Sequence, residues 1–158
     1  MGSLLLVAPS SKLTMIVRGY IDAKDRKAAV LLWTNVFGYS AGHNDPSFVI
    51  SQKIEANDGL FFIATDAETL VGTVMAGYDG HRGWIYSLAV SSECRKRGIG
   101  AALVRHAEEA LVQKGCAKVN LQVIATNTEV VSFYEKLGYT VEPRISMGKK
   151  LESPISRC

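Results

Sequence analysis

The most informative stretch of this chain is LAVSSECRKRGIGAAL, which runs from Leu88 to Leu103. Its first residues are typical of a strand. From Ile99, apolar residues recur every four positions, as on one face of a helix. The turn between strand and helix holds Arg95, Lys96, Arg97, Gly98 and Gly100. A helix start presents unpaired N–H groups and the positive end of the helix dipole, and glycine lets a ligand approach the backbone. The stretch predicts a phosphate-binding turn, with an ordinary tight turn as the alternative.

Two common nucleotide-binding motifs do not fit this turn. Leu103 stands where a dinucleotide-binding fingerprint has its third glycine. Gly100 is followed by two alanines, so the Lys-Ser/Thr pair of a P-loop is missing. Both motifs are therefore excluded.

Length and charge narrow the class of protein. The chain has 158 residues, 47% of them hydrophobic and 21% charged, which is the composition of one globular domain. Its 18 Lys and Arg against 15 Asp and Glu give a net charge of +3. That charge is too small to indicate a nucleic-acid partner, and three of the basic residues stand together in the turn. No specific nucleic-acid partner is expected.

The ends of the chain and its cysteines add further expectations. Residues 1–14 are interpreted as a disordered lead, a cloning remnant or a misassigned start, residues 15–150 as the folded domain, and residues 151–158 as a C-terminal tail. No run approaches the roughly 20 apolar residues of a membrane span, so no membrane partner is expected. Cys94, Cys116 and Cys158 are widely spaced and predict neither a disulfide framework nor a metal site. A cytoplasmic location is expected.

Hydrophobic periodicity predicts an α+β fold in an α/β three-layer arrangement. Strands are expected at 16–20, 60–64, 70–78, 84–90, 119–124, 139–141 and 145–147, and helices at 22–38, 47–56, 99–114 and 129–137. Asp79-Gly80 predicts a hairpin between the third and fourth strands.

A second motif follows the helix. Asn127 precedes Phe133-Tyr134-Glu135-Lys136-Leu137-Gly138-Tyr139, and upstream stands Arg95-x-x-Gly98-x-Gly100. Together and in this order the two motifs resemble the signature of the GCN5-related N-acetyltransferases, the GNAT family. The resemblance covers about residues 16–150 and implies a mixed, mostly antiparallel central sheet flanked by helices. The runs 71–83 and 44–46 are similar to the bacterial YpeA-like branch.

The resemblance implies transfer of an acetyl group from acetyl-coenzyme A, as co-substrate, to a primary amine by direct attack in a ternary complex. It places the pyrophosphate on backbone N–H groups of the turn and the pantetheine arm on the main chain of Leu88 and Val90. An N–H near Leu88 would polarise the thioester carbonyl. The implied cofactor-binding residues are Leu88, Val90, Arg95, Lys96, Arg97, Gly98, Ile99, Gly100, Ala101, Asn127 and Tyr134.

Tyr134 resembles the general acid of the family, which protonates the departing thiolate. A thiol has a pKa of about 8.5 and a tyrosine about 10, so the expected proton transfer is not far from balanced. The alternative for Tyr134 is packing beside Phe133, and for Asn127 it is a plain helix cap.

The general base has no obvious candidate. Many relatives carry a glutamate on the strand occupied here by residues 84–87, and this chain has none there. Asp45, Asp79, His81 or ordered water would take the proton. Each side chain also has a structural alternative: Asp45 as a helix cap, Asp79 as a turn former and His81 as a solvated loop residue.

The missing base motivates a second hypothesis, a non-catalytic coenzyme A-binding sensor or interaction module with the same fold. For the enzyme, the acceptor is a small-molecule or protein amine. We expect the loops at 38–46 and 78–83 to recognise it. A homodimer remains open.

Overall fold

The computed structural model describes residues 14–38 and 42–151. They fall into two compact units, one within Met1–Gln122 and one within Val123–Cys158. The predicted lead (1–14) and tail (151–158) lie outside the described residues except for Thr14 and Leu151. No helix among the described residues is long and apolar enough to cross a membrane.

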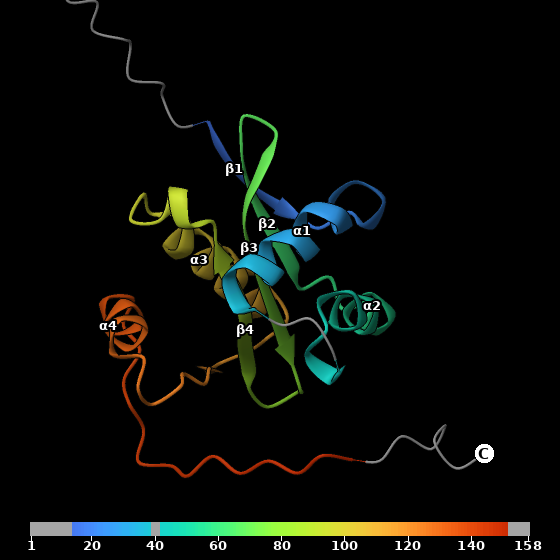
Figure 1. The fold of residues 1–158 in the computed structure, drawn as a ribbon. Coiled ribbons are helices and arrows are strands. Elements are labelled where there is room, and N and C mark those ends of the chain that lie inside the picture. The colour runs from blue at the N-terminus through green and yellow to red at the C-terminus, as the bar shows by residue number, and fades with distance from the viewer. Residues whose placement is uncertain (1–13, 39–41, 152–158) are drawn as a thin grey trace, which may run out of the picture. The chain divides into compact units, whose positions relative to one another are not determined.

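The first unit is built on a five-stranded sheet in the order β1-β2-β3-β4-β5 (Figure 1). Pairing is antiparallel from β1 to β4, and β5 is parallel to β4. The strands are β1 (Met15–Gly19), β2 (Phe61–Asp66), β3 (Thr69–Tyr78), β4 (Gly83–Val90) and β5 (Val119–Asn120), and the helices are α1 (Asp22–Phe37), α2 (Pro46–Ala56) and α3 (Ile99–Gln113). Short 3₁₀ turns span Gly42–Asn44 and Ser92–Cys94. The predicted mixed, mostly antiparallel sheet with flanking helices is confirmed.

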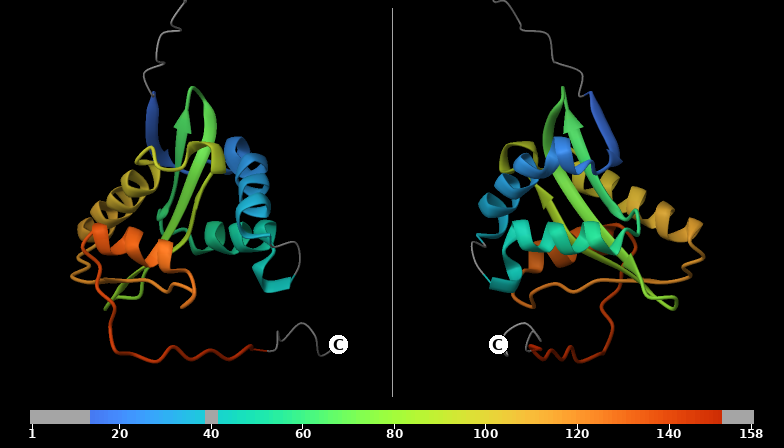
Figure 2. Two further views of the ribbon diagram at one scale, coloured as in Figure 1. Left: turned by 60° about the vertical axis from the view of Figure 1, so that its left-hand side comes forward. Right: turned by 90° about the vertical axis from the view of Figure 1, so that its right-hand side faces the viewer.

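The helices cover both faces of this sheet. Figure 2 shows α1 and α2 on one face and α3 on the other. Alternate residues of β3 serve the two layers, because neighbouring side chains of a strand point to opposite faces. Thr73 contacts Trp33 of α1, whereas a Cβ on Gly72 would lie only 2.9 Å from Leu103 of α3. Glycine at position 72 therefore lets α3 pack closely on the sheet.

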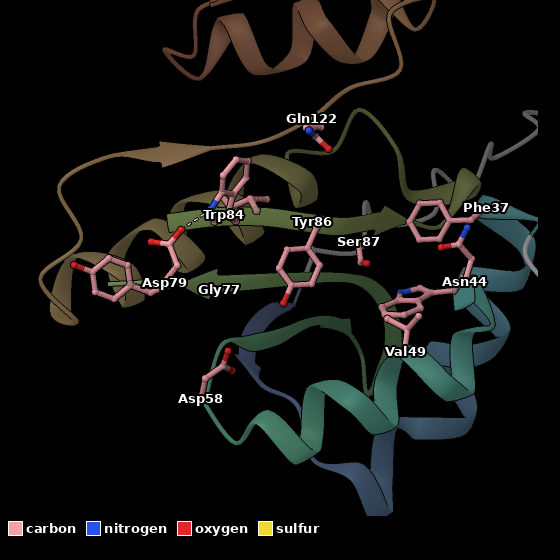
Figure 3. A pocket seen from close by; sticks show the side chains of 13 residues that line it. Phe37, Asn44, Val49, Asp58, Gly77, Asp79, Trp84, Tyr86, Ser87 and Gln122 are labelled. Atoms are coloured by element: carbon pink, nitrogen blue, oxygen red, sulfur yellow. Dashed lines mark hydrogen bonds between the residues drawn. The ribbon is translucent and has the colours of Figure 1, made fainter. Parts of the chain in front are cut away.

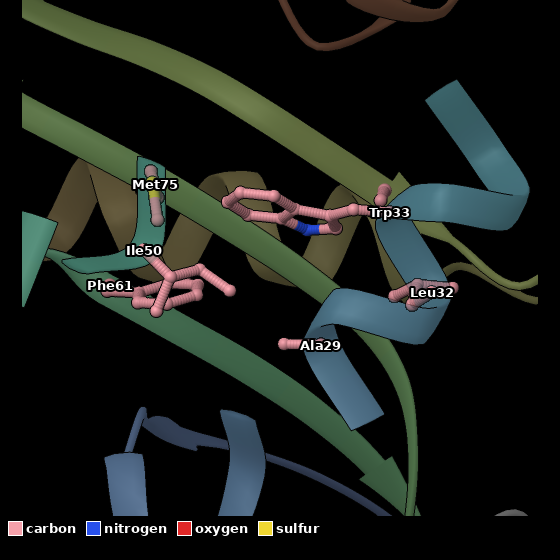
Figure 4. Packing of buried hydrophobic residues seen from close by; sticks show 7 residues of the cluster. Ala29, Leu32, Trp33, Ile50, Phe61 and Met75 are labelled. Atoms are coloured by element: carbon pink, nitrogen blue, oxygen red, sulfur yellow. The ribbon is translucent and has the colours of Figure 1, made fainter. Parts of the chain in front are cut away.

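A hydrophobic cluster lies on the α1 and α2 face (Figure 4). It consists of Ala29, Leu32, Trp33, Ile50, Phe61, Met75 and Ala89, each no more than 8% exposed. The first three recur at helical spacing along α1, which explains why this stretch is helical and which side it buries. Each large side chain buried here contributes about 1.5–3 kcal/mol of transfer free energy.

Helix α3 buries the stripe that the sequence predicted. Its buried residues are Ile99, Leu103, Val104, Ala107 and Leu111. The helix ends at Gln113, and Gly115 follows with a φ of +85°. A left-handed residue just after a helix is the common way to end it, and glycine adopts that conformation without strain. At its other end, Ile99 is buried, and a Cβ on Gly72 of β3 would lie 3.2 Å from its side chain, so the first residue of α3 packs on the sheet.

A β-bulge interrupts the pairing of β3 and β4. Thr73 pairs with Ala89 and Met75 with Tyr86, so two residues of β4, Ser87 and Leu88, stand opposite the single residue between Thr73 and Met75. Ser87 has a φ of +52°, in the left-handed region. A bulge bends its strand and increases the local twist.

The bend explains why β5 is shorter than predicted. β5 pairs only with Gly83 and Trp84 at the start of β4, so the expected strand at 119–124 reduces to Val119–Asn120. Beyond Trp84, this edge of β4 has no strand neighbour in the described part of the chain.

The second unit contains α4 (Thr128–Lys136), close to the prediction of 129–137. The predicted strands at 139–141 and 145–147 are wrong: residues 139–147 form no strand in the structure. A strand needs a neighbouring strand to pair its N–H and C=O groups, and the described part of this unit supplies only a helix. Pro143, which has no N–H, and a bond from Arg144 N–H to the Glu142 carbonyl (2.8 Å) bend the chain there.

Candidate active site

The turn before α3 forms an uncapped helix start. Gly98 is the N-cap residue with a φ of +81°, no side chain caps the helix, and its first turn holds no acidic residue. The N–H of Ala102 donates to the Gly98 carbonyl (3.0 Å), which leaves the N–H groups of Ile99, Gly100 and Ala101 at the helix start. These groups, together with the helix dipole, favour an anion.

The three basic side chains of the turn are exposed and differ in their contacts. Arg97 forms an ion pair with Asp66 (3.3 Å), and the Nε of Arg95 donates to the Val90 carbonyl (3.4 Å). Lys96 has a φ of +60°, so the backbone turns sharply at this position. A lysine in the left-handed region is uncommon, and such residues occur mainly in tight turns. Positive charge therefore surrounds the helix start, although Asp66 balances part of it.

The open edge of β4 lies directly before this turn. Ser91 N–H donates to the Val71 carbonyl (2.9 Å), so Ser91 directs its main chain to β3. Because alternate residues of a regular strand direct their main-chain groups to opposite edges, Val90 directs its groups to the edge that β5 leaves uncovered. Leu88 lies two residues earlier, in the bulge. An extended amide-containing ligand can add to such an edge as a further strand does. The structure thus brings the predicted strand residues and the predicted turn together.

A buried hydrogen-bond chain supports the bulge. Trp33 Nε1 donates to the Thr73 hydroxyl (2.7 Å), and that hydroxyl donates to the Ser87 carbonyl (3.4 Å). Trp33 is 3% exposed and Thr73 0%. Buried polar groups without a partner are costly, so these two hydrogen bonds hold Ser87, the left-handed residue next to Leu88, in place.

A cavity of about 890 Å³ lies beside β4 (Figure 3). Residues of both predicted recognition loops line it, Asn44 from 38–46 and Tyr78 with Asp79 from 78–83. Sequence reasoning did not identify the other lining residues, which are Trp33, Phe37, Val49, Asp58, Gly77, Trp84, Ile85, Tyr86, Ser87 and Gln122. The volume lies within the usual range for small-molecule sites.

Lys53 contacts two residues of the cavity wall, Asp58 and Tyr86. The sequence did not identify this lysine. Its side chain is 5% exposed, and its Nζ donates to Asp58 (2.6 Å), to the Tyr86 hydroxyl (3.0 Å) and to the Ala76 carbonyl. All three ammonium hydrogens are thereby used. Lysine on a helix is usually exposed, so only its tertiary contacts could have identified it.

The three candidate bases occupy different places. Asp45 caps α2 by accepting from Phe48 N–H (2.9 Å), and His81 is exposed on the β3–β4 hairpin. Asp79 is the only one of the three that lines the cavity. Hydrogen bonds from the backbone N–H groups of Arg82 and His81 lower the pKa of Asp79.

Asn127 and Tyr134 belong to the second unit. The Asn127 side chain accepts from Val130 N–H (3.3 Å) and caps α4. Tyr134 is 8% exposed and makes edge-to-face contacts with Phe133 and Tyr139, at centroid distances of 5.0 and 5.5 Å. Burial raises the pKa of Tyr134 to about 12.

This raised pKa predicts a specific alkaline transition. The folded state favours the neutral phenol, so its stabilisation is present below about pH 10 and is lost as the pH rises towards 12, by up to about 3 kcal/mol. We expect Tyr134→Phe to remove one late-ionising phenol from a titration of tyrosinate absorbance and to flatten the alkaline loss of stability. Burial also raises the pKa of Tyr20, so Tyr20→Phe serves as the control that removes a different late-ionising phenol. An unchanged titration in Tyr134→Phe would contradict the burial of this hydroxyl.

Among residues 14–38 and 42–151, no cluster of three or more His, Cys, Asp or Glu side chains is arranged to hold a metal ion. Cys94 and Cys116 are free thiols.

Comparison with known proteins gives one consistent result. The family model described as the acetyltransferase (GNAT) family matches residues 28–139. A protein named acetyltransferase from Yersinia pestis (strain Pestoides F) is 39% identical over 127 residues, which cover 80% of this chain and 89% of that protein. Another acetyltransferase, from Sodalis glossinidius, is 43% identical over 109 residues, covering 68% of this chain and 77% of that protein.

Solved structures share the fold at lower sequence identity. An aminoglycoside N-acetyltransferase in complex with coenzyme A has a TM-score of 0.74 at 19% identity, covering 96% of this chain and 100% of that one. The Ard1 protein of Thermoplasma volcanium has a TM-score of 0.71 at 21% identity, covering 82% and 85%.

Proposed function

This chain belongs to the GNAT family of acetyltransferases, and on that premise we propose that it transfers an acetyl group from acetyl-coenzyme A to a primary amine by direct attack in a ternary complex. The observation that carries the proposal is the uncapped start of α3 beside the open edge of β4. One element suits a pyrophosphate and the other an extended arm of amides, and coenzyme A contains both in sequence.

The residues present fit this co-substrate. The N–H groups of Ile99, Gly100 and Ala101 would bind the pyrophosphate, with Arg95 and Lys96 adding positive charge. The main chain of Leu88 and Val90 would bind the pantetheine arm, and Asn127 would contribute its remaining hydrogen-bonding capacity. Acetyl-coenzyme A supplies an activated thioester when it is bound.

The chemistry requires two actions from the protein, one at the carbonyl oxygen and one at the departing sulfur. The Leu88 N–H would donate to the carbonyl oxygen as negative charge develops on it. The amine nitrogen forms the new bond to the carbonyl carbon, the carbon–sulfur bond breaks, and the amine loses one proton. Tyr134 would donate a hydrogen bond, or its proton, to the departing sulfur.

The pKa of Tyr134 changes the balance expected from the sequence. Against a thiol pKa of about 8.5, a tyrosine at about 12 makes complete proton transfer unfavourable by about 3.5 pKa units, or about 5 kcal/mol. We therefore propose that Tyr134 stabilises the developing thiolate mainly as a hydrogen-bond donor that stays protonated throughout the physiological range.

Water is the base that we favour. The Asp45 carboxylate is occupied as the cap of α2, and His81 lies outside the residues that line the cavity. Asp79 lines the cavity, but its lowered pKa makes it a poor acceptor for the proton of an ammonium group. Trp84 and Tyr86 are 37% and 41% exposed, so water has access to this side of β4.

Thiol release tests the proposal. The protein is incubated with acetyl-coenzyme A and a panel of amines, and amine-dependent release of free thiol is followed. We expect turnover with at least one amine and a fall of kcat by about 100-fold in Tyr134→Phe, within the usual range for a general acid or donor. Tight coenzyme A binding in calorimetry with no turnover across the panel would instead support a coenzyme A-binding sensor or interaction module.

The free thiols of Cys94 and Cys116 suit a reducing compartment, and we place the reaction in the cytoplasm.

A further inference from the structure

The cavity runs along β4, and its two ends differ in chemistry (Figure 3). At the β3–β4 hairpin stand Asp79 and Trp84, joined by a hydrogen bond from the Trp84 indole to the Asp79 carboxylate (3.2 Å). At the other end, Phe37 and Asn44 lie near the bulge residue Ser87. The residue after Ser87 is Leu88, whose N–H is proposed above to bind the thioester carbonyl. The reacting amine therefore belongs at the Ser87 end.

The two ends are separated by a substantial distance. From Trp84 to Ser87 the strand advances by three residues, which corresponds to about 10 Å. A group bound by Asp79 is consequently not the group that attacks the thioester. Between the two ends stands Tyr86, whose hydroxyl is held by Lys53 (3.0 Å) so that its ring forms part of the cavity wall.

Asp79 keeps its negative charge available to a ligand. Its Oδ1 accepts from the N–H groups of His81 (2.8 Å) and Arg82 (2.6 Å), and its Oδ2 accepts from the Trp84 indole. All these donors are neutral. The other carboxylate of the cavity, Asp58, is balanced by its ion pair with Lys53 (2.6 Å). The cavity thus presents one carboxylate that no basic side chain neutralises through an ion pair in the described part of the chain.

The two ends of the cavity favour different protonation states of a bound amino group. An amine attacks a thioester only as the neutral species, and a neighbouring carboxylate would hold it in the ammonium form. A carboxylate about 10 Å away has a much weaker effect on that amine, because the Coulomb energy falls with distance and is screened by salt. Such a carboxylate instead binds a second amino group that stays protonated. Trp84 beside Asp79 adds an aromatic ring, which also attracts a cation.

We propose that the acceptor is an extended diamine or polyamine, with one amino group reacting at the Ser87 end while a second, protonated one binds Asp79 and Trp84. The connecting chain crosses the Tyr86 ring. This inference rests on the proposed function, because it names the class of amine that the acetyl group reaches. It excludes amines whose far end carries a phosphate or carboxylate, which Asp79 would repel.

The test compares amines of one length that differ in the second charge. Amine-dependent acetylation of diaminooctane and of octylamine is measured with the full chain, and putrescine serves as a diamine too short to cover the span. We expect kcat/KM for diaminooctane to exceed the values for octylamine and putrescine by about 10-fold or more, the usual effect of one charge-assisted hydrogen bond.

Asp79→Asn removes the charge but keeps an oxygen that can accept the hairpin hydrogen bonds. It should lower kcat/KM for diaminooctane about 10-fold. The control is Glu68→Gln, which removes one negative charge at an exposed position in the β2–β3 turn. It should leave kcat/KM unchanged for both diaminooctane and octylamine. If Asp79→Asn does not fold, the wild-type preference for the diamine should still fall as salt is raised.

Three results are informative. A diamine preference that disappears in Asp79→Asn, or with salt, supports the inference. Equal turnover of octylamine and diaminooctane would overturn the inference and leave the proposed acetyl transfer intact. Turnover of neither amine, nor of any other amine in the panel, would overturn the proposed function itself.

Discussion

Replacing Gly100 by aspartate is expected to weaken coenzyme A binding by about 100- to 1000-fold without destabilising the protein. The new carboxylate would stand at the start of α3, where the pyrophosphate is proposed to bind. Two like charges about 4 Å apart near a protein surface repel by about 4 kcal/mol. An acidic residue in the first turn of a helix, by contrast, stabilises the helix by about 0.3–1 kcal/mol. Calorimetry with coenzyme A and a thermal unfolding curve measure the two effects separately.

Gly100→Ala is the matched control, since it adds a Cβ but no charge. We expect it to bind coenzyme A much more tightly than Gly100→Asp. Equal losses in both variants would mean that space rather than charge limits binding. Normal binding by Gly100→Asp would show that the start of α3 does not hold the phosphates.

Replacing Thr73 by valine is expected to lower kcat by about 10- to 100-fold, with a smaller change in KM. Thr73 does not line the cavity, so it acts as a positioning residue: it links Trp33 to the carbonyl of Ser87. Loss of the hydroxyl frees the strained residue before Leu88 and misplaces the N–H that is proposed to stabilise the oxyanion. Removing one oxyanion donor typically costs about 100-fold or more, and a displaced donor costs less. Steady-state kinetics that separate kcat from KM provide the measurement.

Stability alone does not explain such a pattern. Thr73→Val leaves the buried Trp33 N–H unpaired, at a cost of about 1–3 kcal/mol, and thermal unfolding reports that part. Thr73→Ser keeps the hydroxyl and should restore kcat even if the lost methyl lowers stability. A kcat that follows the unfolding temperature through all variants, with no rescue by serine, would argue against the positioning role.

The turn and the regular elements could be predicted because their signals are local. Ile99, Leu103, Ala107 and Leu111 recur at the helical period, and the glycines mark where α3 begins. Likewise, Asp79-Gly80 marks the hairpin between β3 and β4. Each of these features depends on neighbours in sequence, so the sequence alone carries the information.

Features that depend on tertiary contacts could not be predicted in this way. The bulge at Ser87 carries no glycine, and its hydrogen-bond chain reaches back to Thr73 and Trp33. The burial of Lys53 depends on Asp58 and Tyr86, and a lysine on α2 resembles any exposed helical lysine. The shortened β5 follows from the direction that β4 takes after the bulge.

The charge of the candidate site was only partly visible in the sequence. The run Arg95–Arg97 predicts a positive turn, but it does not reveal that Arg97 pairs with Asp66. Similarly, Asp79 is readable as a turn former. Its position on the cavity wall beside Trp84 emerges only when the hairpin is folded against the rest of the sheet.

Transfer of a labelled acetyl group tests the central claim most directly. The protein is incubated with isotopically labelled acetyl-coenzyme A and diaminooctane, and the products are analysed by mass spectrometry. We predict a labelled amide formed in equal amount to the free coenzyme A released, with both products lost in Gly100→Asp. If diaminooctane gives no labelled amide, the experiment is repeated with the other amines of the panel. Absence of a labelled amide with every one of them would contradict acetyl transfer to an amine at this site.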